Sequence, residues 1–477
     1  MKTLVKSDHK YMEVADRIET LIENGVMKVG DKLLSVRALS KEQGISLSTA
    51  FQAYYFLESK GLIEARPQSG YYVKFTPKLY PELPTVCDPP EDAMPVTVDE
   101  MIASVYKELY ARPVINFSLA APPVDLLPSA KLNKAITAAI RNSDTSCLHY
   151  EAAQGNVELR KQIARQAFNW GGTFKEDDIV VTAGCLEAIS LCLRAVTKAG
   201  DAVAIESPTF FSFFQVMESM GLKVVEIPST PLTGIDMNYL EEAIKRFEIK
   251  ACLFVPNFNN PMGGCIPDEN KKKLVDMLAE KDIPLIEDDI YGELYFGKTR
   301  PRTCKSFDKK GMVLHCSSFS KSLAPGYRIG WTIPGQYKDQ VVRLKRMNTA
   351  ATNTLAQVAL ASFLSNGRYE LHLRHIRKEL HTQSLRYAQA ISEYFPDDTR
   401  MTRPQGGFTL WVELNKKINA YKLFKKALKH NIGISPGQIF SSQGRFENCF
   451  RLSCGMAWNN KVEEAIKTLG RLAKEMK

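Results

Sequence analysis

Lys321 and Arg328 lie in a segment, residues 317–331, that is rich in small hydroxyl residues and follows an apolar run of strand length. A lysine amine can attack an aldehyde carbon and form a Schiff base. An arginine can bind a phosphate group through two parallel N–H donors. The pair alone is modest evidence, because loops of serine, lysine and arginine are also common on solvated surfaces.

Three polar residues elsewhere suit a ligand that carries both groups. Asp288 ends the apolar run 284–288, Tyr291 follows three residues later, and Asn260 lies in a loop after another apolar run. Pyridoxal phosphate needs a carboxylate that keeps its ring nitrogen protonated, so that the ring can act as an electron sink. A phenol and an amide near the ring's 3-oxygen complete such a site. The constellation therefore predicts a pyridoxal phosphate site with the aldehyde on Lys321.

Two further junctions fit the same ligand. The turn into a helix at Gly184 and Cys185 offers free N–H groups, which suit a phosphate. Phe210 follows the predicted strand 202–206, where its ring can stack on a pyridine. Each feature also has a simpler explanation, since Phe210 can be ordinary core and Asp288 a strand-end cap.

The elements that must position these residues alternate from about residue 113 onward. Apolar runs of strand length are separated mostly by helical stretches, which is typical of a mainly parallel sheet covered on both faces. The last eighty residues change to a smaller α+β pattern. The predicted strands are 178–183, 202–206, 223–227, 251–255, 284–288 and 312–317.

The first seventy-odd residues predict a different module. Three short helices are expected over 11–24, 36–43 and 47–60, the third capped by Ser46, and a strand–turn–strand follows over 62–74. This is a helix-turn-helix plan with a wing, in which the third helix can lie in a major groove. Six prolines between residues 75 and 96 then predict a semi-stiff linker.

Residues 30–39, 44–50 and 54–63, with the glycine of the wing, resemble the winged DNA-binding domain of the GntR family. Leu34 stands where proline is usual, and Leu47 stands where an arginine commonly begins the recognition helix. That missing cation removes one phosphate or guanine contact. The alternative is a three-helix interaction domain that has lost its affinity for DNA. The candidate DNA contacts are Arg37, Ser46, Ser48, Thr49, Gln52 and Arg66.

Taken in order, the motifs of residues 113–477 resemble a fold-type I, aspartate aminotransferase-like domain. The resemblance assigns Lys321 to the internal Schiff base with pyridoxal phosphate and Asp288 to the pyridine nitrogen. It assigns Tyr291 and Asn260 to the 3-oxygen, and Phe210 to ring stacking. The residues that it puts at or beside the phosphate are Gly184, Cys185, Ser318, Ser320 and Arg328.

Two more residues are carried over from the same resemblance. Tyr150 matches a tyrosine that reaches the phosphate of the partner subunit, and Arg451 matches the arginine that binds a substrate α-carboxylate. Arg451 can also be a surface ion pair. Ala120 and Ala121 replace a usual glycine, which narrows the amino-acid site, and Cys185 replaces a usual small hydroxyl residue.

Composition excludes several other classes. The 477 residues carry 63 Lys and Arg against 53 Asp and Glu, a net charge of +10, but residues 1–76 hold only +2 of it. Ten scattered cysteines and seven histidines show no metal-ligand spacing, so reduced thiols and no structural zinc are expected. We find neither a membrane-spanning apolar stretch nor a signal-peptide core, and expect a cytoplasmic protein.

The whole chain resembles the MocR subfamily of GntR regulators. The resemblance implies a homodimeric transcriptional regulator that holds pyridoxal phosphate on Lys321 and changes its binding to operator DNA when an amino compound, or the cofactor itself, binds. The alternative is an active aminotransferase with an accessory winged-helix domain. The predicted organisation is a winged helix-turn-helix over 1–75, a Pro-rich linker over 76–112, a cofactor-binding large domain over 113–390 and a small subdomain over 391–477.

Overall fold

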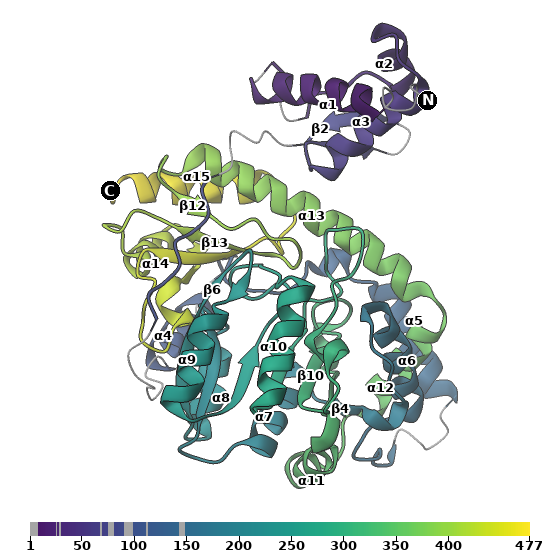
Figure 1. The fold of residues 1–477 in the computed structure, drawn as a ribbon, viewed down its shortest axis with the longest axis vertical. Helices are drawn as coiled ribbons and strands as arrows, with labels where there is room; N and C mark the ends of the chain where they lie inside the picture. The colour runs from purple at the N-terminus through teal and green to yellow at the C-terminus, as the bar shows by residue number, and fades with distance from the viewer. Residues whose placement is uncertain are drawn as a thin grey trace, which may run out of the picture. The chain divides into compact units, whose positions relative to one another are not determined.

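A computed structural model of the chain describes residues 8–24, 26–27, 30–66, 69–74, 81–89, 99–110, 113–142 and 148–477. Its contacts separate a smaller unit, which holds the chain up to Pro81 together with 385–397, from a larger unit that holds the rest (Figure 1). Each unit is built around its own hydrophobic cluster.

The smaller unit is a winged helix-turn-helix. Ser35 and Ser46 cap the second and third helices by accepting hydrogen bonds from the backbone N–H three residues later. The core includes Ile18, Leu39 and Leu57, one from each helix. The predicted module is therefore confirmed. Its elements are α1 (Asp8–Glu23), α2 (Val36–Glu42), α3 (Leu47–Ser59) and an antiparallel wing of β1 (Ile63–Arg66) and β2 (Gly70–Val73).

The larger unit is built on an eight-stranded sheet in the order β4-β11-β10-β9-β8-β5-β6-β7. The strands from β10 to β6 pair in parallel, as the apolar runs predict, whereas β11 is antiparallel to both of its neighbours and β7 to its single neighbour. The strands are β4 (Val180–Thr182), β5 (Ala202–Ser207), β6 (Lys223–Thr230), β7 (Gly234–Ile235), β8 (Ile249–Phe254), β9 (Leu285–Asp288), β10 (Val313–Ser318) and β11 (Gly330–Ile333).

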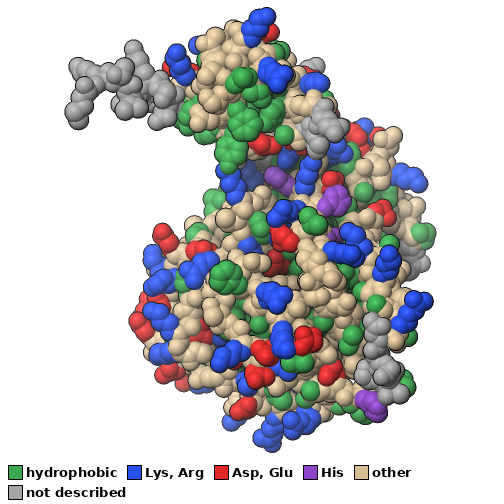
Figure 2. All heavy atoms as spheres, turned by 90° about the vertical axis from the view of Figure 1, so that its right-hand side faces the viewer, with side chains coloured by type: hydrophobic (Ala, Val, Ile, Leu, Met, Phe, Trp, Pro, Cys, Tyr) green, Lys and Arg blue, Asp and Glu red, His purple; other side chains and the backbone are tan. Residues whose placement is uncertain are grey.

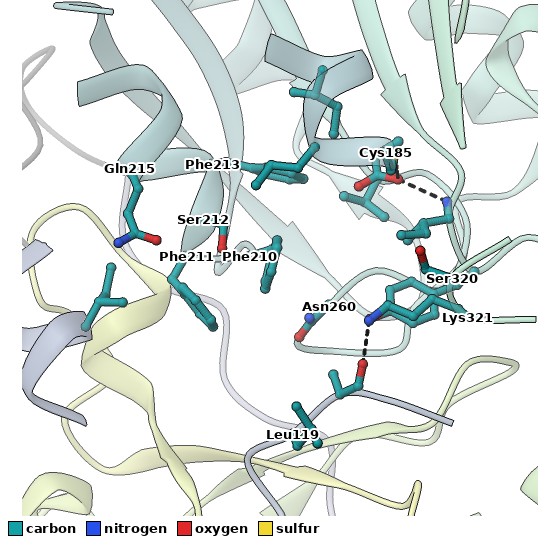
Figure 3. A pocket seen from close by; sticks show the side chains of 18 of the residues that line it. Leu119, Cys185, Phe210, Phe211, Ser212, Phe213, Gln215, Asn260, Ser320 and Lys321 are labelled. Carbon is teal, nitrogen blue, oxygen red and sulfur yellow. Dashed lines mark hydrogen bonds between the residues drawn. The ribbon is translucent and has the colours of Figure 1, made fainter. Parts of the chain in front are cut away.

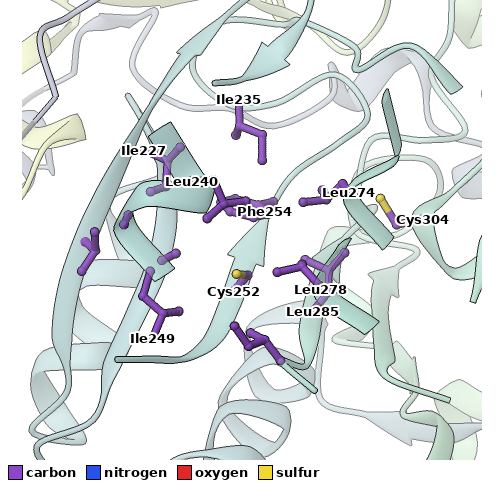
Figure 4. Packing of buried hydrophobic residues seen from close by; sticks show 14 of the residues in the cluster. Ile227, Ile235, Leu240, Ile249, Cys252, Phe254, Leu274, Leu278, Leu285 and Cys304 are labelled. Carbon is purple, nitrogen blue, oxygen red and sulfur yellow. The ribbon is translucent and has the colours of Figure 1, made fainter. Parts of the chain in front are cut away.

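Helices cover both faces of this sheet. Leu240 of α9 and Leu274 of α10 lie beside Phe254 on one face (Figure 4). Val313 belongs to the same hydrophobic cluster. Cys316, three residues after Val313, contacts Cys192 of α7, so α7 covers the opposite face. The helices of the unit up to α12 are α4 (Asp99–Tyr110), α5 (Ser129–Asn142), α6 (Val157–Ala167), α7 (Cys185–Val196), α8 (Ser212–Ser219), α9 (Met237–Phe247), α10 (Asp268–Glu280), α11 (Lys338–Asn348) and α12 (Thr354–Ser365).

The C-terminal part forms the expected α+β subdomain after the long helix α13 (Arg368–Tyr394). Its antiparallel sheet has the order β12-β13-β16-β15. Two short strands, β3 and β14, pair in parallel and connect an early segment of the larger unit to this subdomain. The elements are β3 (Ile115–Asn116), β12 (Arg400–Met401), β13 (Thr409–Glu413), α14 (Ala420–Lys429), β14 (Ile432–Gly433), β15 (Ser435–Pro436), β16 (Cys449–Ser453) and α15 (Asn460–Lys474).

Two observations differ from the sequence-based expectations. Residues 99–110, which we expected to be linker, form α4, and the expected subdomain boundary at 390/391 falls inside α13. None of the described helices combines the length and the apolar character that a membrane span requires.

Candidate functional site

A cavity of about 470 Å³ lies at the carboxyl ends of the parallel strands, where ligands of open α/β sheets bind (Figure 3). Several elements meet there. Asp288 ends β9, Asn260 follows β8, Phe210 follows β5, and Lys321 follows β10. The other lining residues include Cys185 and Leu186 of α7, Arg451 of β16, Ile102, Ala103 and Tyr106 of α4, and Leu119, Ala120, Phe211, Phe213, Gln215, Tyr291, Ser320 and Arg328.

Lys321 extends into this cavity between Asn260 and Leu119 (Figure 3). Its Nζ donates a hydrogen bond of 2.5 Å to the carbonyl of Ala120. Burial lowers the pKa of the amine from 10.5 to about 8, helped by the charge of Arg451 and opposed by Asp288. A useful fraction of the amine is therefore neutral near pH 7, as a nucleophile requires.

Asp288 is a buried carboxylate that contacts neutral donors. Its Oδ1 accepts hydrogen bonds from the Cys185 thiol at 3.3 Å and from the backbone N–H of Ile290 at 3.0 Å. Burial raises the pKa of the carboxyl group to about 6, although these two donors oppose the shift. Because both donors are neutral, a cationic N–H in the cavity would stabilise the ionised carboxylate.

Arg451 is a buried guanidinium, 1% exposed, whose contacts are also neutral. It donates from Nη1 to Asn260 Oδ1 at 3.0 Å and from Nη2 to Ser435 Oγ at 3.0 Å and the carbonyl of Ser118. Its Nε is buried and has no partner in the described part of the chain. A buried charge without a counter-ion is costly, so this arrangement suits an anionic ligand.

Tyr291 lies beside Asn260 and presents a protonated phenol. Burial raises the pKa of Tyr291 well above its ordinary value, and the neighbouring Arg451 and Asn260 oppose that shift only in part. The ring is held edge-on against Phe408 at 5.6 Å between centroids. A phenol held in this way can donate a hydrogen bond to a ligand oxygen.

The N-terminus of α7 forms a small cradle with Arg328. Gly184 has φ 95°, and a methyl group there would collide with the Arg328 guanidinium. Arg328 Nη2 donates to the carbonyl of Ala183 at 3.2 Å, and Nη1 to Ser320 Oγ at 3.4 Å. Ser318 Oγ accepts from the Ser320 N–H at 3.0 Å. Free helical N–H groups, hydroxyls and a guanidinium together match a phosphate.

Not every predicted site residue lies at the cavity wall. Tyr150 is 92% exposed and does not line it. The Cys185 thiol points to Asp288, whereas the sequence suggested a place beside the phosphate. Phe210 does line the cavity, with its ring 4.7 Å from that of Phe211.

Sequence reasoning missed the contribution of α4. It placed Ala120 and Ala121 at the amino-acid site but did not foresee that backbone carbonyls of this segment bind two cationic side chains. Ile102 and Tyr106 of α4 line the cavity. The carbonyls of Ser118 and Ala120 accept hydrogen bonds from Arg451 and Lys321, respectively. The apolar spacing of Ile102, Val105 and Leu109, all buried, was the signal that could have located α4.

In the smaller unit, the candidate DNA contacts lie on α2 and α3. Arg37 and Gln52 are exposed, and Ser48 and Thr49 are hydrogen-bonded to the capping Ser46 at 2.8 Å. Ser46 therefore has a structural role besides any contact with DNA. Arg66 ends β1, and its side chain lies outside the described part of the structure.

The outer face of α3 is apolar. Leu47, Phe51 and Tyr55 follow one another at four-residue spacing and are 54%, 53% and 46% exposed. Figure 2 shows hydrophobic side chains exposed on this unit. Apolar side chains on a recognition helix can contact thymine methyl groups.

Comparison with known families gives two matches. Residues 10–73 match the family described as bacterial regulatory proteins, gntR family, and residues 112–469 match aminotransferase class I and II. The HTH-type transcriptional regulators YjiR and YdcR of Escherichia coli K12 are both 37% identical to this chain. The alignments cover 97% and 98% of this chain and 98% and 99% of those proteins, respectively.

Solved structures resemble the larger unit. Alpha-aminoadipate aminotransferase LysN of Thermus thermophilus, complexed with N-(5'-phosphopyridoxyl)-L-leucine, has a TM-score of 0.72 and 28% identity. The kynurenine aminotransferase of Pyrococcus horikoshii, in complex with PMP, has a TM-score of 0.73 and 27% identity. Each match covers 79% of this chain and 94% of the other.

Proposed function

The chain belongs to the MocR subfamily of GntR transcriptional regulators, and from this premise we propose that it holds pyridoxal phosphate on Lys321 and that an amino compound bound there changes its affinity for DNA. The observation that carries the proposal is one cavity that brings together an amine of lowered pKa, a buried carboxylate and a buried guanidinium whose partners among the described residues are all neutral.

The residues present fit the cofactor at each of its ends. The Lys321 amine would hold the aldehyde carbon, Asp288 would keep a proton on the ring nitrogen, and Tyr291 and Asn260 would bind the 3-oxygen. When bound, pyridoxal phosphate supplies an electrophilic carbon and an electron-withdrawing ring. Phe210 would stack on that ring. The phosphate would lie in the cradle of Gly184, Cys185, Ser318, Ser320 and Arg328.

Arg451 would bind the carboxylate of an effector amino acid. Hydrogen bonds to three neutral groups orient the guanidinium. Its buried Nε–H has no hydrogen-bond partner among the described residues and could donate to a ligand. The effector must bind one conformation of the protein more tightly than another, because equal affinity for both would shift no equilibrium.

We propose that the protein acts as a homodimer in the cytoplasm. The 92% exposed Tyr150 would then reach the phosphate of the partner subunit. A dimer would also offer two winged helices to paired operator half-sites. We revise the expected domain limits of 1–75, 76–112, 113–390 and 391–477 at two places: α4 is assigned to the cofactor unit, and the small subdomain is taken to begin after α13.

The test is a spectral titration of the purified protein with amino compounds, run beside a mobility-shift assay on its own upstream DNA. We expect the cofactor spectrum and the DNA affinity to change over the same range of effector concentration. Sustained conversion of an added keto acid, without any change in DNA binding, would favour the aminotransferase alternative. DNA binding that responds to pyridoxal phosphate alone would identify the cofactor as the ligand sensed.

Cofactor loading should depend on pH through the Lys321 amine. A pKa of about 8 leaves about one amine in ten neutral at pH 7, against about one in three thousand for a lysine at 10.5. Since only the neutral amine attacks, the rate of covalent attachment to cofactor-free protein should rise with pH and level off above about 8. Stopped-flow absorbance measures this rate. A rate that keeps rising tenfold per pH unit up to pH 10 would contradict the lowered pKa.

Replacing Leu47 with arginine should strengthen DNA binding. Leu47 opens α3 and is 54% exposed, so an arginine there can reach a phosphate or a guanine. We expect about a tenfold gain in affinity, and a slope of log K against log salt that is steeper by about 0.9. The control is Val26→Arg, which adds the same charge at a residue that is 68% exposed but outside α3. Equal gains in DNA affinity from both variants would show that the added charge acts without a specific contact from α3.

A further inference from the structure

The segment 118–120 lies directly between the two groups that would anchor an amino acid. The carbonyl of Ser118 accepts a hydrogen bond from Arg451, and the carbonyl of Ala120 accepts one from Lys321. Leu119 lies between these carbonyls and lines the cavity, and Figure 3 shows it next to the Lys321 amine. A ligand with its carboxylate at Arg451 and its amino group at the cofactor carbon that Lys321 would hold would therefore contact Leu119.

Apolar and aromatic side chains also line the cavity beyond Leu119. Ile102 and Tyr106 reach it from α4, and the Tyr106 ring packs on Phe211 at 5.2 Å between centroids. Phe211 in turn packs edge-on against Phe440 at 5.9 Å. The Arg451 guanidinium lies 5.3 Å from the centre of that last ring. A chain of aromatic contacts thus runs from Tyr106 through Phe211 and Phe440 to the Arg451 guanidinium.

The charges around the cavity are already assigned. Among the described residues that line the cavity, the acidic and basic side chains are those of Asp288, Lys321, Arg328 and Arg451. The first three would serve the cofactor and the fourth the α-carboxylate. An additional charge on the effector side chain would find no further opposite charge among these lining residues, only neutral groups such as those of Ser212 and Gln215. Burying a charge without an ion partner is unfavourable.

We infer that the effector is an α-amino acid with an uncharged, apolar side chain of about the size of leucine or phenylalanine. This inference rests on the proposed function, which it narrows from an amino compound to one chemical class. Leu119 and the α4 residues select the side chain, while Arg451 and the cofactor carried by Lys321 bind the carboxylate and the amino group that all amino acids share.

The experiment titrates the cofactor-loaded protein with L-leucine, L-phenylalanine, L-alanine, L-glutamate and L-lysine and follows the cofactor spectrum. Each buried methylene changes affinity by about fourfold, so L-leucine and L-phenylalanine should bind at least about tenfold tighter than L-alanine. L-Glutamate and L-lysine should bind at least about tenfold more weakly than L-leucine. Equal or tighter binding of either charged amino acid would overturn the inference, and so would a spectrum that responds to none of the five.

Two variants of Leu119 sharpen the test. Leu119→Arg should reverse the preference and favour L-glutamate over L-leucine, whereas Leu232→Arg, at a residue 56% exposed and away from the cavity, should keep the wild-type order. Leu119→Ala should weaken the binding of L-leucine several-fold and leave the affinity for L-alanine unchanged. An unchanged order in Leu119→Arg with its cofactor spectrum intact would overturn the inference. A colourless wild-type protein would instead overturn the proposed function, and the inference with it.

Discussion

Lys321→Ala protein is expected to lose all covalent attachment of pyridoxal phosphate while it remains folded. The Lys321 amine extends into the cavity and is the proposed nucleophile, and alanine has no amine. Addition of borohydride to the variant should therefore trap no cofactor on the protein, whereas the wild type should retain it through gel filtration in denaturant. Absorbance and intact mass measure the difference, and circular dichroism reports on the fold.

The chain offers a matched control in Lys345. Burial lowers the pKa of this lysine to about 8 as well, and its Nζ donates to the carbonyl of Ala153 at 2.5 Å, much as Lys321 donates to Ala120. Lys345 does not line the cavity. Lys345→Ala should thus keep the covalent cofactor. If the two variants lost it equally, a lowered pKa, and not position in the cavity, would explain the reactivity.

Arg451→Gln protein should bind cofactor normally but respond poorly to amino acids. Glutamine can still hydrogen-bond to Asn260 but carries no charge for a carboxylate. Loss of one member of a buried, hydrogen-bonded charge pair costs about 2–5 kcal/mol, so the apparent affinity for an amino acid should fall at least about thirtyfold. Spectral titration measures this loss directly.

An amine without a carboxylate provides the chemical control for this variant. 3-Methylbutylamine is L-leucine without its carboxylate, so Arg451→Gln should leave its affinity unchanged within about twofold. The coupling energy between Arg451 and the carboxylate is the difference between the losses of binding free energy that the substitution causes for the two ligands. If the substitution weakened both ligands equally, Arg451 would act on the shape of the site and not on the carboxylate.

The strands and the residues at their ends were predictable from sequence for a physical reason. Strands buried on both faces read as continuous apolar runs, and the parallel order brings their carboxyl ends to one edge. Asp288, Asn260, Phe210 and Lys321 each follow such a run, and the structure brings them to one cavity. The helices and wing of the smaller unit were likewise marked by Ser46 and by helical spacing.

Contacts that depend on the backbone or on distant segments were not predictable. Arg451 is held by the carbonyl of Ser118, and no side-chain pattern encodes a carbonyl contact between residues 333 positions apart. The thiol of Cys185 turned to Asp288 because the strand end and the helix start meet, a fact of packing that local sequence does not contain. The six prolines before residue 96 outweighed the helical spacing of α4, so its place in the cavity wall was missed.

The central claim is that the Lys321 amine carries the cofactor. The most direct measurement is reduction of the wild-type holoprotein with borohydride, followed by proteolysis and tandem mass spectrometry of the modified peptide. The phosphopyridoxyl mass should lie on Lys321 and on no other lysine. A modification found mainly at Lys345 or at surface lysines, or a protein that takes up no pyridoxal phosphate, would contradict the account.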